Sequence, residues 1–147
     1  MKAVLLTELH KLELADVPEP RRQSADEVLL RIDAVGICGS DVHYYKTGRI
    51  GALVVEFPWV LGHECCGTVL EVGAEARGLK VGQRVAIDPL VVCGRCDQCL
   101  AGRKHTCRNQ KFLGCPGQKA GSLCERMVMP AECCFPLPEG MTDEQAV

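Results

Sequence analysis

The sequence lacks the features that mark membrane, secreted and nucleic-acid-binding proteins. No apolar run in its 147 residues approaches the roughly 18 needed to cross a bilayer. Glu8, His10 and Lys11 follow the first residues closely, so the start has no signal-peptide pattern. The net charge is only −2, whereas nucleic-acid surfaces need clustered positive charge. We therefore expect no membrane or nucleic-acid partner and a cytoplasmic location.

Cysteine is the residue that is present in excess. Hydrophobic residues make up 47% and charged residues 24% of the chain, which suits one globular domain with a core. Eleven residues are cysteine, an odd number. Where no secretion signal is present, spaced thiols indicate metal binding before disulfides. The composition therefore predicts a soluble, intracellular, metal-binding domain.

Strand patterns dominate the chain. Residues 27–35 alternate, with Val28, Leu30, Ile32 and Ala34 on one face. One short helix is expected at 40–46, with Ser40 as its cap and Gly48 at its end. Short strands at this spacing favour an all-β barrel or sandwich, so the predicted fold class is mainly β. Further β-favouring runs lie at 68–72, 84–87 and 125–129.

The carboxyl-terminal residues contain the start signal of another helix. Thr142 and Gln145 have the spacing of a capping box, and Asp143 and Glu144 suit the positive end of a helix. The sequence stops at Val147, within the first turn, and so short a helix is not stable in water. We therefore expect the sequence to be part of a longer chain.

The strongest motif is a cysteine quartet, C-x₂-C-x₂-C-x₇-C, in a loop rich in glycine and charge. Four thiolates at this spacing can converge on one tetrahedral zinc ion, and a closed site of this kind is structural. Nearby Arg95, Arg103 and Lys104 would offset its negative charge. One alternative is an iron–sulfur cluster, but the ferredoxin pattern needs a shorter last gap and a proline after the fourth cysteine. The other alternative is four unrelated thiols. The quartet consists of Cys93, Cys96, Cys99 and Cys107.

A second group of candidate ligands is spread more widely. Cys38 and His63 are residue types that zinc accepts, and Glu64 adds an adjacent carboxylate. Glu64 does not belong to a metalloprotease helix, because Gly67 stands where the second histidine would be. Glycines on both sides would allow a close approach of backbone or ligand. Taken alone, however, a single histidine is more often a hydrogen-bonded polar residue than a ligand.

Taken together, the motifs resemble one family. The order C-G-S-D-x-H, G-H-E-x-x-G and C-x₂-C-x₂-C-x₇-C is similar to the zinc-dependent medium-chain alcohol dehydrogenases, over nearly the whole chain. Residues 38–45 and 48–51 most resemble the sorbitol, xylitol and arabinitol dehydrogenases. The resemblance implies that residues 1–147 form a GroES-like, partly open β-barrel catalytic domain with short helices. Its structural-zinc lobe would lie at about 90–110, and a Rossmann cofactor domain would follow outside this sequence.

The resemblance also implies a catalytic zinc site. Cys38 and His63 would be zinc ligands, and Glu64 would be either a ligand or a base that holds a water at the metal. Asp41 would orient His63 through its second ring nitrogen. The family completes this site with a Glu or Cys a few residues beyond Val147.

Three residues of the expected helix would act on the substrate. Ser40 would take the proton of the alcohol, and His43, whose ordinary pKa lies near the working pH, would pass it to solvent. Tyr44 would line the substrate pocket. The purely structural alternatives are a helix cap for Ser40, a solvated position for His43 and ordinary packing for Tyr44. Phe57 and Trp59 are interpreted as core residues.

Some features depart from the family or are missing. Cys65 and Cys66 stand where the family has small residues, and a reduced thiol is small enough to fit. No G-x-G-x-x-G turn occurs, because Gly114, Gly117 and Gly121 have the wrong spacing. The remaining cysteines have no metal role in the family, and we interpret them as buried or free thiols: Cys115, Cys124, Cys133 and Cys134.

The resulting hypothesis is an NAD- or NADP-dependent dehydrogenase of polyols or secondary alcohols that binds catalytic and structural Zn²⁺. It would oxidise the alcohol to a ketone, and the parent enzyme would be a homo-oligomer. Because the cofactor fingerprint is missing, these 147 residues are not expected to transfer hydride alone. The alternative hypothesis is a non-catalytic zinc module that binds a protein partner through its cysteine-rich lobe.

Overall fold

The computed structural model describes all 147 residues and is built mainly from strands. Five of them form an antiparallel sheet in the order β11-β3-β7-β8-β12. A second sheet has the order β2-β1-β6, and an isolated bridge from Ala3 to Cys124 lies between the two. The strands are β1 (Lys2–Glu8), β2 (Lys11–Asp16), β3 (Glu27–Gly36), β4 (Arg49–Ile50), β5 (Leu53–Val54), β6 (Trp59–Val60), β7 (Glu64–Val72), β8 (Arg84–Ile87), β9 (Leu90–Val91), β10 (Lys111–Phe112), β11 (Arg126–Pro130) and β12 (Cys134–Pro136).

The sheets enclose two apolar clusters. In the larger one, Val28 and Leu30 of β3 are fully buried, which confirms the inward face predicted from their alternation. Val69 of β7 and Val85 of β8 are also fully buried there. The smaller cluster joins β1 to the helix side of the domain and consists of Leu6, Tyr44, Val55 and Leu61. Because the two sheets do not join into one closed ladder, the barrel is partly open, as expected.

Helical segments are few and short. They are α1 (Gly39–Thr47), α2 (Asp97–Leu100) and the 3₁₀ turns η1 (Lys104–Thr106) and η2 (Ala131–Cys133). The helix predicted at 40–46 is α1, and Gly48 ends it with a positive φ of 69°, as expected. The cap prediction was wrong: the N-cap is Cys38, and Ser40 lies inside the first turn. The helix starts early because the Asp41 carboxylate accepts the Cys38 N–H at 3.0 Å.

The predicted strands are present with small changes in their ends. Residues 84–87 form β8 as predicted, and 27–35 extend by one residue in β3. The run at 68–72 is only the second half of β7, which already begins at Glu64. The run at 125–129 shifts by one residue in β11. The Thr142 N–H donates to the Gln145 side chain at 3.0 Å, as in a capping box, but within a turn.

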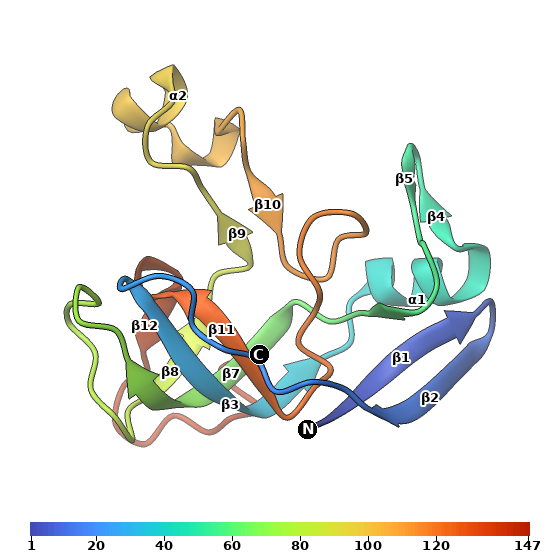
Figure 1. Cartoon of the computed structure of the whole chain (residues 1–147), viewed down its shortest axis with the longest axis horizontal. Coiled ribbons are helices and arrows are strands. Elements are labelled where there is room, and N and C mark those ends of the chain that lie inside the picture. The colour runs from blue at the N-terminus through green and yellow to red at the C-terminus, as the bar shows by residue number, and fades with distance from the viewer.

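The cysteine quartet lies in a lobe that projects from the barrel. Figure 1 shows this lobe, with α2, at the end of the two strands β9 and β10. These strands pair antiparallel, with Lys111 opposite Val91 and Phe112 opposite Leu90. The chain therefore leaves the barrel, forms the lobe and returns beside its own exit.

Cysteines outside the candidate sites are buried or free, as interpreted. All eleven cysteines are unbridged, and Cys65 and Cys66 are buried in β7. Burial raises the pKa of the Cys133 and Cys134 thiols to about 12, so they stay protonated near neutral pH. Cys115 is also buried, and Cys124 is half-buried.

Two aromatic residues, Phe57 and Trp59, were predicted to lie in the core. Phe57 is 40% exposed, so its assignment to the core was wrong. Trp59 packs against the smaller cluster, and its indole N–H donates to the Gly114 carbonyl at 3.0 Å.

None of the helices is long and apolar enough to cross a membrane.

Gly67 provides a test of the strand packing. A Cβ at this position would overlap the carbonyl oxygen of Arg31 on β3, so Gly67→Ala should lower the free energy of unfolding by about 1–3 kcal/mol. At Gly39, in contrast, nothing lies within 4 Å of an added Cβ. Urea unfolding of Gly67→Ala and the control Gly39→Ala measures the difference, and equal stability of the two variants would contradict this register.

Candidate metal centres

Strand pairing brings the widely spaced ligand candidates together. In the ladder between β3 and β7, Gly36 lies opposite Glu64. The chain leaves β3 and enters α1 through Cys38, while His63 immediately precedes β7. The end of one strand therefore faces the start of its neighbour, and Cys38 lies near His63 although 25 positions separate them.

These three residues form a candidate metal site. The ligand atoms of Cys38, His63 and Glu64 all lie within 4.8 Å of one another. Cys38 and His63 are half-buried, and Glu64 is exposed. A thiolate, an imidazole and a carboxylate make a donor set that zinc accepts, and three protein ligands are typical of a site that keeps a position open. The residues present therefore fit the zinc ion that their types suggested.

Asp41 connects the two segments that carry the ligands. It is only 4% exposed, and its Oδ1 accepts the Gly62 N–H at 3.1 Å while Oδ2 accepts the Cys38 N–H. Oδ1 also lies 3.7 Å from His63 Nδ1. The carboxylate thus faces the Nδ1 side of the imidazole, which leaves Nε2 for a metal.

Helix α1 places the other predicted site residues beside this group. Ser40 is half-buried and lies two residues beyond Cys38, whereas His43 is exposed. Tyr44 is 6% exposed and packs in the smaller cluster with Leu6 and Leu61. Burial raises the pKa of the Tyr44 phenol to about 12. Its packing role is therefore visible, and its role toward substrate stays a prediction.

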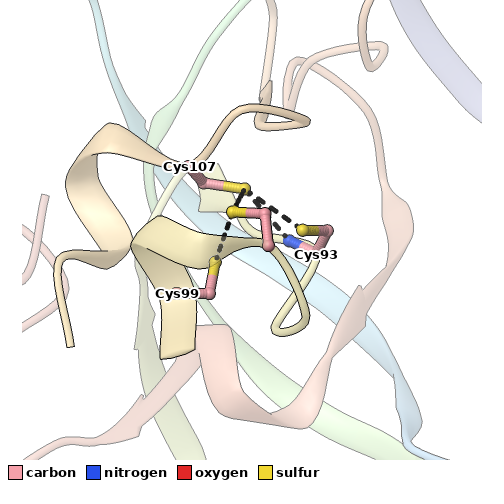
Figure 2. A group of neighbouring side chains, drawn as sticks. Cys93, Cys99 and Cys107 are labelled. Carbon is pink, nitrogen blue, oxygen red and sulfur yellow. Dashed lines mark hydrogen bonds between the residues drawn. The ribbon is translucent and has the colours of Figure 1, made fainter. Parts of the chain in front are cut away.

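The cysteine quartet forms the other group. Its four sulfurs all lie within 4.8 Å of one another, and Figure 2 shows those of Cys93, Cys99 and Cys107 pointing toward one another. The Sγ–Sγ distances are 3.5 Å for Cys96–Cys99, 4.0 Å for Cys96–Cys107 and 3.5 Å for Cys93–Cys107. Four thiolates about 2.3 Å from one tetrahedral zinc ion would be about 3.8 Å apart, so the quartet fits zinc.

Backbone and charged groups surround these sulfurs. The N–H groups of Cys93 and Asn109 each donate to Cys107 Sγ at 3.4 Å. Backbone N–H groups also lower the pKa of Cys93 to about 6, whereas desolvation raises that of Cys99 to about 12. The backbone donors thus favour the ionised form of Cys93, whereas desolvation disfavours the ionised form of Cys99.

Two of the basic residues predicted to offset the charge of the quartet, Lys104 and Arg103, interact with other side chains. Lys104 Nζ lies 2.9 Å from Glu132, which anchors the lobe to η2. Arg103 donates to the Gln98 side chain at 2.9 Å. Arg108, which we did not predict to have a role, pairs with Asp97 at 2.6 Å and lowers the pKa of that carboxyl.

Phe112 is a site residue that the sequence did not reveal. Its ring lies 5.3 Å from the His63 ring, centroid to centroid, at an interplanar angle of 61°. Phe112 belongs to β10, the strand that returns from the lobe. The only sequence signal was an isolated aromatic residue after the quartet, and its contact with His63 depends on tertiary folding.

Comparisons with known proteins identify a family and several relatives. The family model "Alcohol dehydrogenase GroES-like domain" matches residues 24–139. The chain is similar to a sorbitol dehydrogenase of Bacillus subtilis (strain 168), with 42% identity over 99% of this chain and 41% of the relative. It is 49% identical to a sorbitol dehydrogenase of Arabidopsis thaliana, over 81% of this chain and 32% of that protein.

Solved structures show the same architecture. The crystal structure of galactitol-1-phosphate dehydrogenase from Escherichia coli is 30% identical, with a TM-score of 0.88, over 99% of this chain and 40% of that one. Both the sorbitol dehydrogenase of Bacillus subtilis and this galactitol-1-phosphate dehydrogenase match nearly all of the chain. The chain spans about two fifths of the length of each of these two proteins. Since the family model covers most of the residues and includes both candidate metal groups, the chain belongs to the family of alcohol dehydrogenase GroES-like domains.

Proposed function

We propose that this chain is the zinc-binding catalytic domain of an NAD(P)-dependent dehydrogenase that oxidises a polyol or secondary alcohol to a ketone. The observation that carries the proposal is the convergence of the Cys38, His63 and Glu64 ligand atoms within 4.8 Å. The quartet would hold a second, structural zinc ion. The nicotinamide cofactor, NAD or NADP, would bind a domain outside these 147 residues, so that the domain alone transfers no hydride.

The side chains around the first group support this reaction. A zinc ion bound there would act as a Lewis acid that makes an alcohol proton easier to remove. Asp41 holds the two ligand-bearing segments together, and it would orient the imidazole of His63. Ser40 would accept the alcohol proton, and exposed His43 would release it to water.

Several finer features belong to the same proposal. The named relatives act on sorbitol or galactitol 1-phosphate, which supports a small polyol or secondary alcohol as the substrate. Tyr44 would form one wall of the substrate site. We further propose that the parent enzyme is a cytoplasmic homo-oligomer that binds neither membrane nor nucleic acid.

The number of bound metal ions separates this function from a non-catalytic zinc module. We expect two zinc ions per chain and one in Cys38→Ser, because that variant keeps the quartet intact. Zinc per folded chain, measured by elemental analysis after dialysis, gives the answer. If the unaltered chain binds one zinc ion, and only substitutions in the quartet remove it, the result would instead support a module that binds a protein partner.

The quartet is expected to contribute to folding. Cys96→Ser should lose one zinc ion and unfold at lower denaturant concentration, because metal binding stabilises a lobe with little core of its own. Cys124→Ser is the control, since it alters a half-buried thiol outside both groups. Unchanged zinc content and stability in Cys96→Ser would remove the structural role.

The proposed proton transfer is tested at Ser40. In the enzyme that includes its cofactor domain, Ser40→Ala should lower kcat by at least about 100-fold, as expected for the loss of a proton-transfer group. Zinc content should stay the same, because Ser40 is not a proposed ligand. Steady-state kinetics and metal analysis of the same preparation measure both, and normal turnover would exclude Ser40 from proton transfer.

A further inference from the structure

One loop encloses the peptide that precedes His63. This segment, residues 112–123, begins at the last residue of β10, ends shortly before β11 and is coloured orange in Figure 1. Its Phe112 ring contacts the His63 ring, and Gly114, Gly121 and Ser122 lie against the Leu61–Gly62 peptide. None of these residues is a candidate metal ligand.

Glycines allow the loop backbone to touch the Leu61–Gly62 peptide directly. A Cβ on Gly114, whose φ is +75°, would lie 2.8 Å from the Gly62 carbonyl oxygen. A Cβ on Gly121 would overlap the carbonyl oxygen of Leu61. Real Cβ atoms do not approach backbone oxygens this closely, so side chains at these positions would displace the peptide.

Hydrogen bonds hold the same peptide in place. The Gly121 N–H donates to Val60 O at 2.8 Å, the Ser122 N–H to Gly62 O at 2.9 Å and the Leu123 N–H to Leu61 O at 3.0 Å. The Gly62 N–H in turn donates to Asp41. Both polar backbone groups of Gly62 are therefore fixed immediately before His63.

The loop is itself closed by internal hydrogen bonds. The Phe112 N–H donates to Gln118 Oε1 at 2.7 Å, and the Gly114 N–H donates to Lys119 O at 2.9 Å. Phe112 thereby has a defined backbone position while its ring contacts the imidazole of His63. The loop can act on His63 as a rigid support.

We propose that the 112–123 loop is the positioning element of the Cys38–His63–Glu64 site and sets its metal affinity. Gly114 and Gly121 fix the peptide before His63, and Phe112 limits rotation of its ring. Residues that orient a metal ligand change affinity about 10–100-fold when altered. This inference rests on the proposed function, because it assumes that these three residues bind a metal.

Gly114 and Gly117 make a matched pair for the test. Both lie in the loop with similar φ angles, +75° and +72°, but nothing lies within 4 Å of a Cβ added at Gly117. Alanine therefore introduces the same backbone strain at both positions, and a collision with Gly62 only at Gly114. We expect Co²⁺ to bind the Cys38 site at least about tenfold more weakly in Gly114→Ala than in Gly117→Ala.

Titration of the metal-free chain with Co²⁺, followed by visible absorption, measures this affinity. The Cys38→Ser variant identifies the bands of the quartet, and unchanged quartet bands show that a variant is folded. If Gly114→Ala does not fold, Phe112→Leu replaces it, because it keeps an apolar side chain and loses the ring contact with His63; its Cys38 site should also weaken.

The outcomes distinguish the two proposals. Equal Co²⁺ affinity at the Cys38 site in the folded Gly114→Ala and Gly117→Ala proteins, or in Phe112→Leu and the unaltered chain, would overturn the positioning role. If the enzyme that includes its cofactor domain binds Co²⁺ at the quartet alone, the proposed catalytic site itself is wrong. A selective loss at the Cys38 site would support both.

Discussion

The pairing of β3 with β7 is the constraint on which the candidate catalytic site depends. It places Gly36 opposite Glu64, and an added Cβ on Gly36 would be 3.1 Å from Glu64 Oε2. The chain turns from β3 into α1 at this point, so a thiol at the helix N-cap meets an imidazole at the strand entrance. Asp41 then joins both segments through two backbone N–H groups. A ligand set distant in sequence is thus fixed by ordinary antiparallel pairing.

The barrel and the cysteine lobe are stabilised by different interactions. The barrel encloses fully buried aliphatic residues such as Leu30, Val69 and Val85. In the lobe, the buried side chains are thiols, Cys99 and Cys107, and Leu100 is 77% exposed. So little apolar burial cannot offset the entropy of ordering the lobe. The proposed zinc ion would supply that free energy.

Sequence patterns predicted what depends on local spacing. The alternation at 27–35 located β3, and the cysteine spacing located a group whose sulfurs do converge. Two-residue strands such as β9 and β10 have no periodicity to detect, and the helix cap at Cys38 depends on a carboxylate three residues later. Cys38 and His63 were candidates by residue type, but only the family resemblance implied that they bind zinc together, since a lone pair at that separation is weak evidence. Phe112 escaped prediction because its contact with His63 exists only after β10 returns from the lobe.

The position of β10 gives the lobe a structural relation to the candidate catalytic site. Lys111 and Phe112 pair with β9, and both strands lead into the lobe that the quartet would close. Phe112 then contacts His63, and the following residues hold the Gly62 peptide. The same short segment therefore ends the lobe and supports the imidazole. A zinc ion that holds the lobe in place would restrict where β10 begins. This ion would therefore stabilise the loop that binds it and would also limit the positions that the His63 side chain can take.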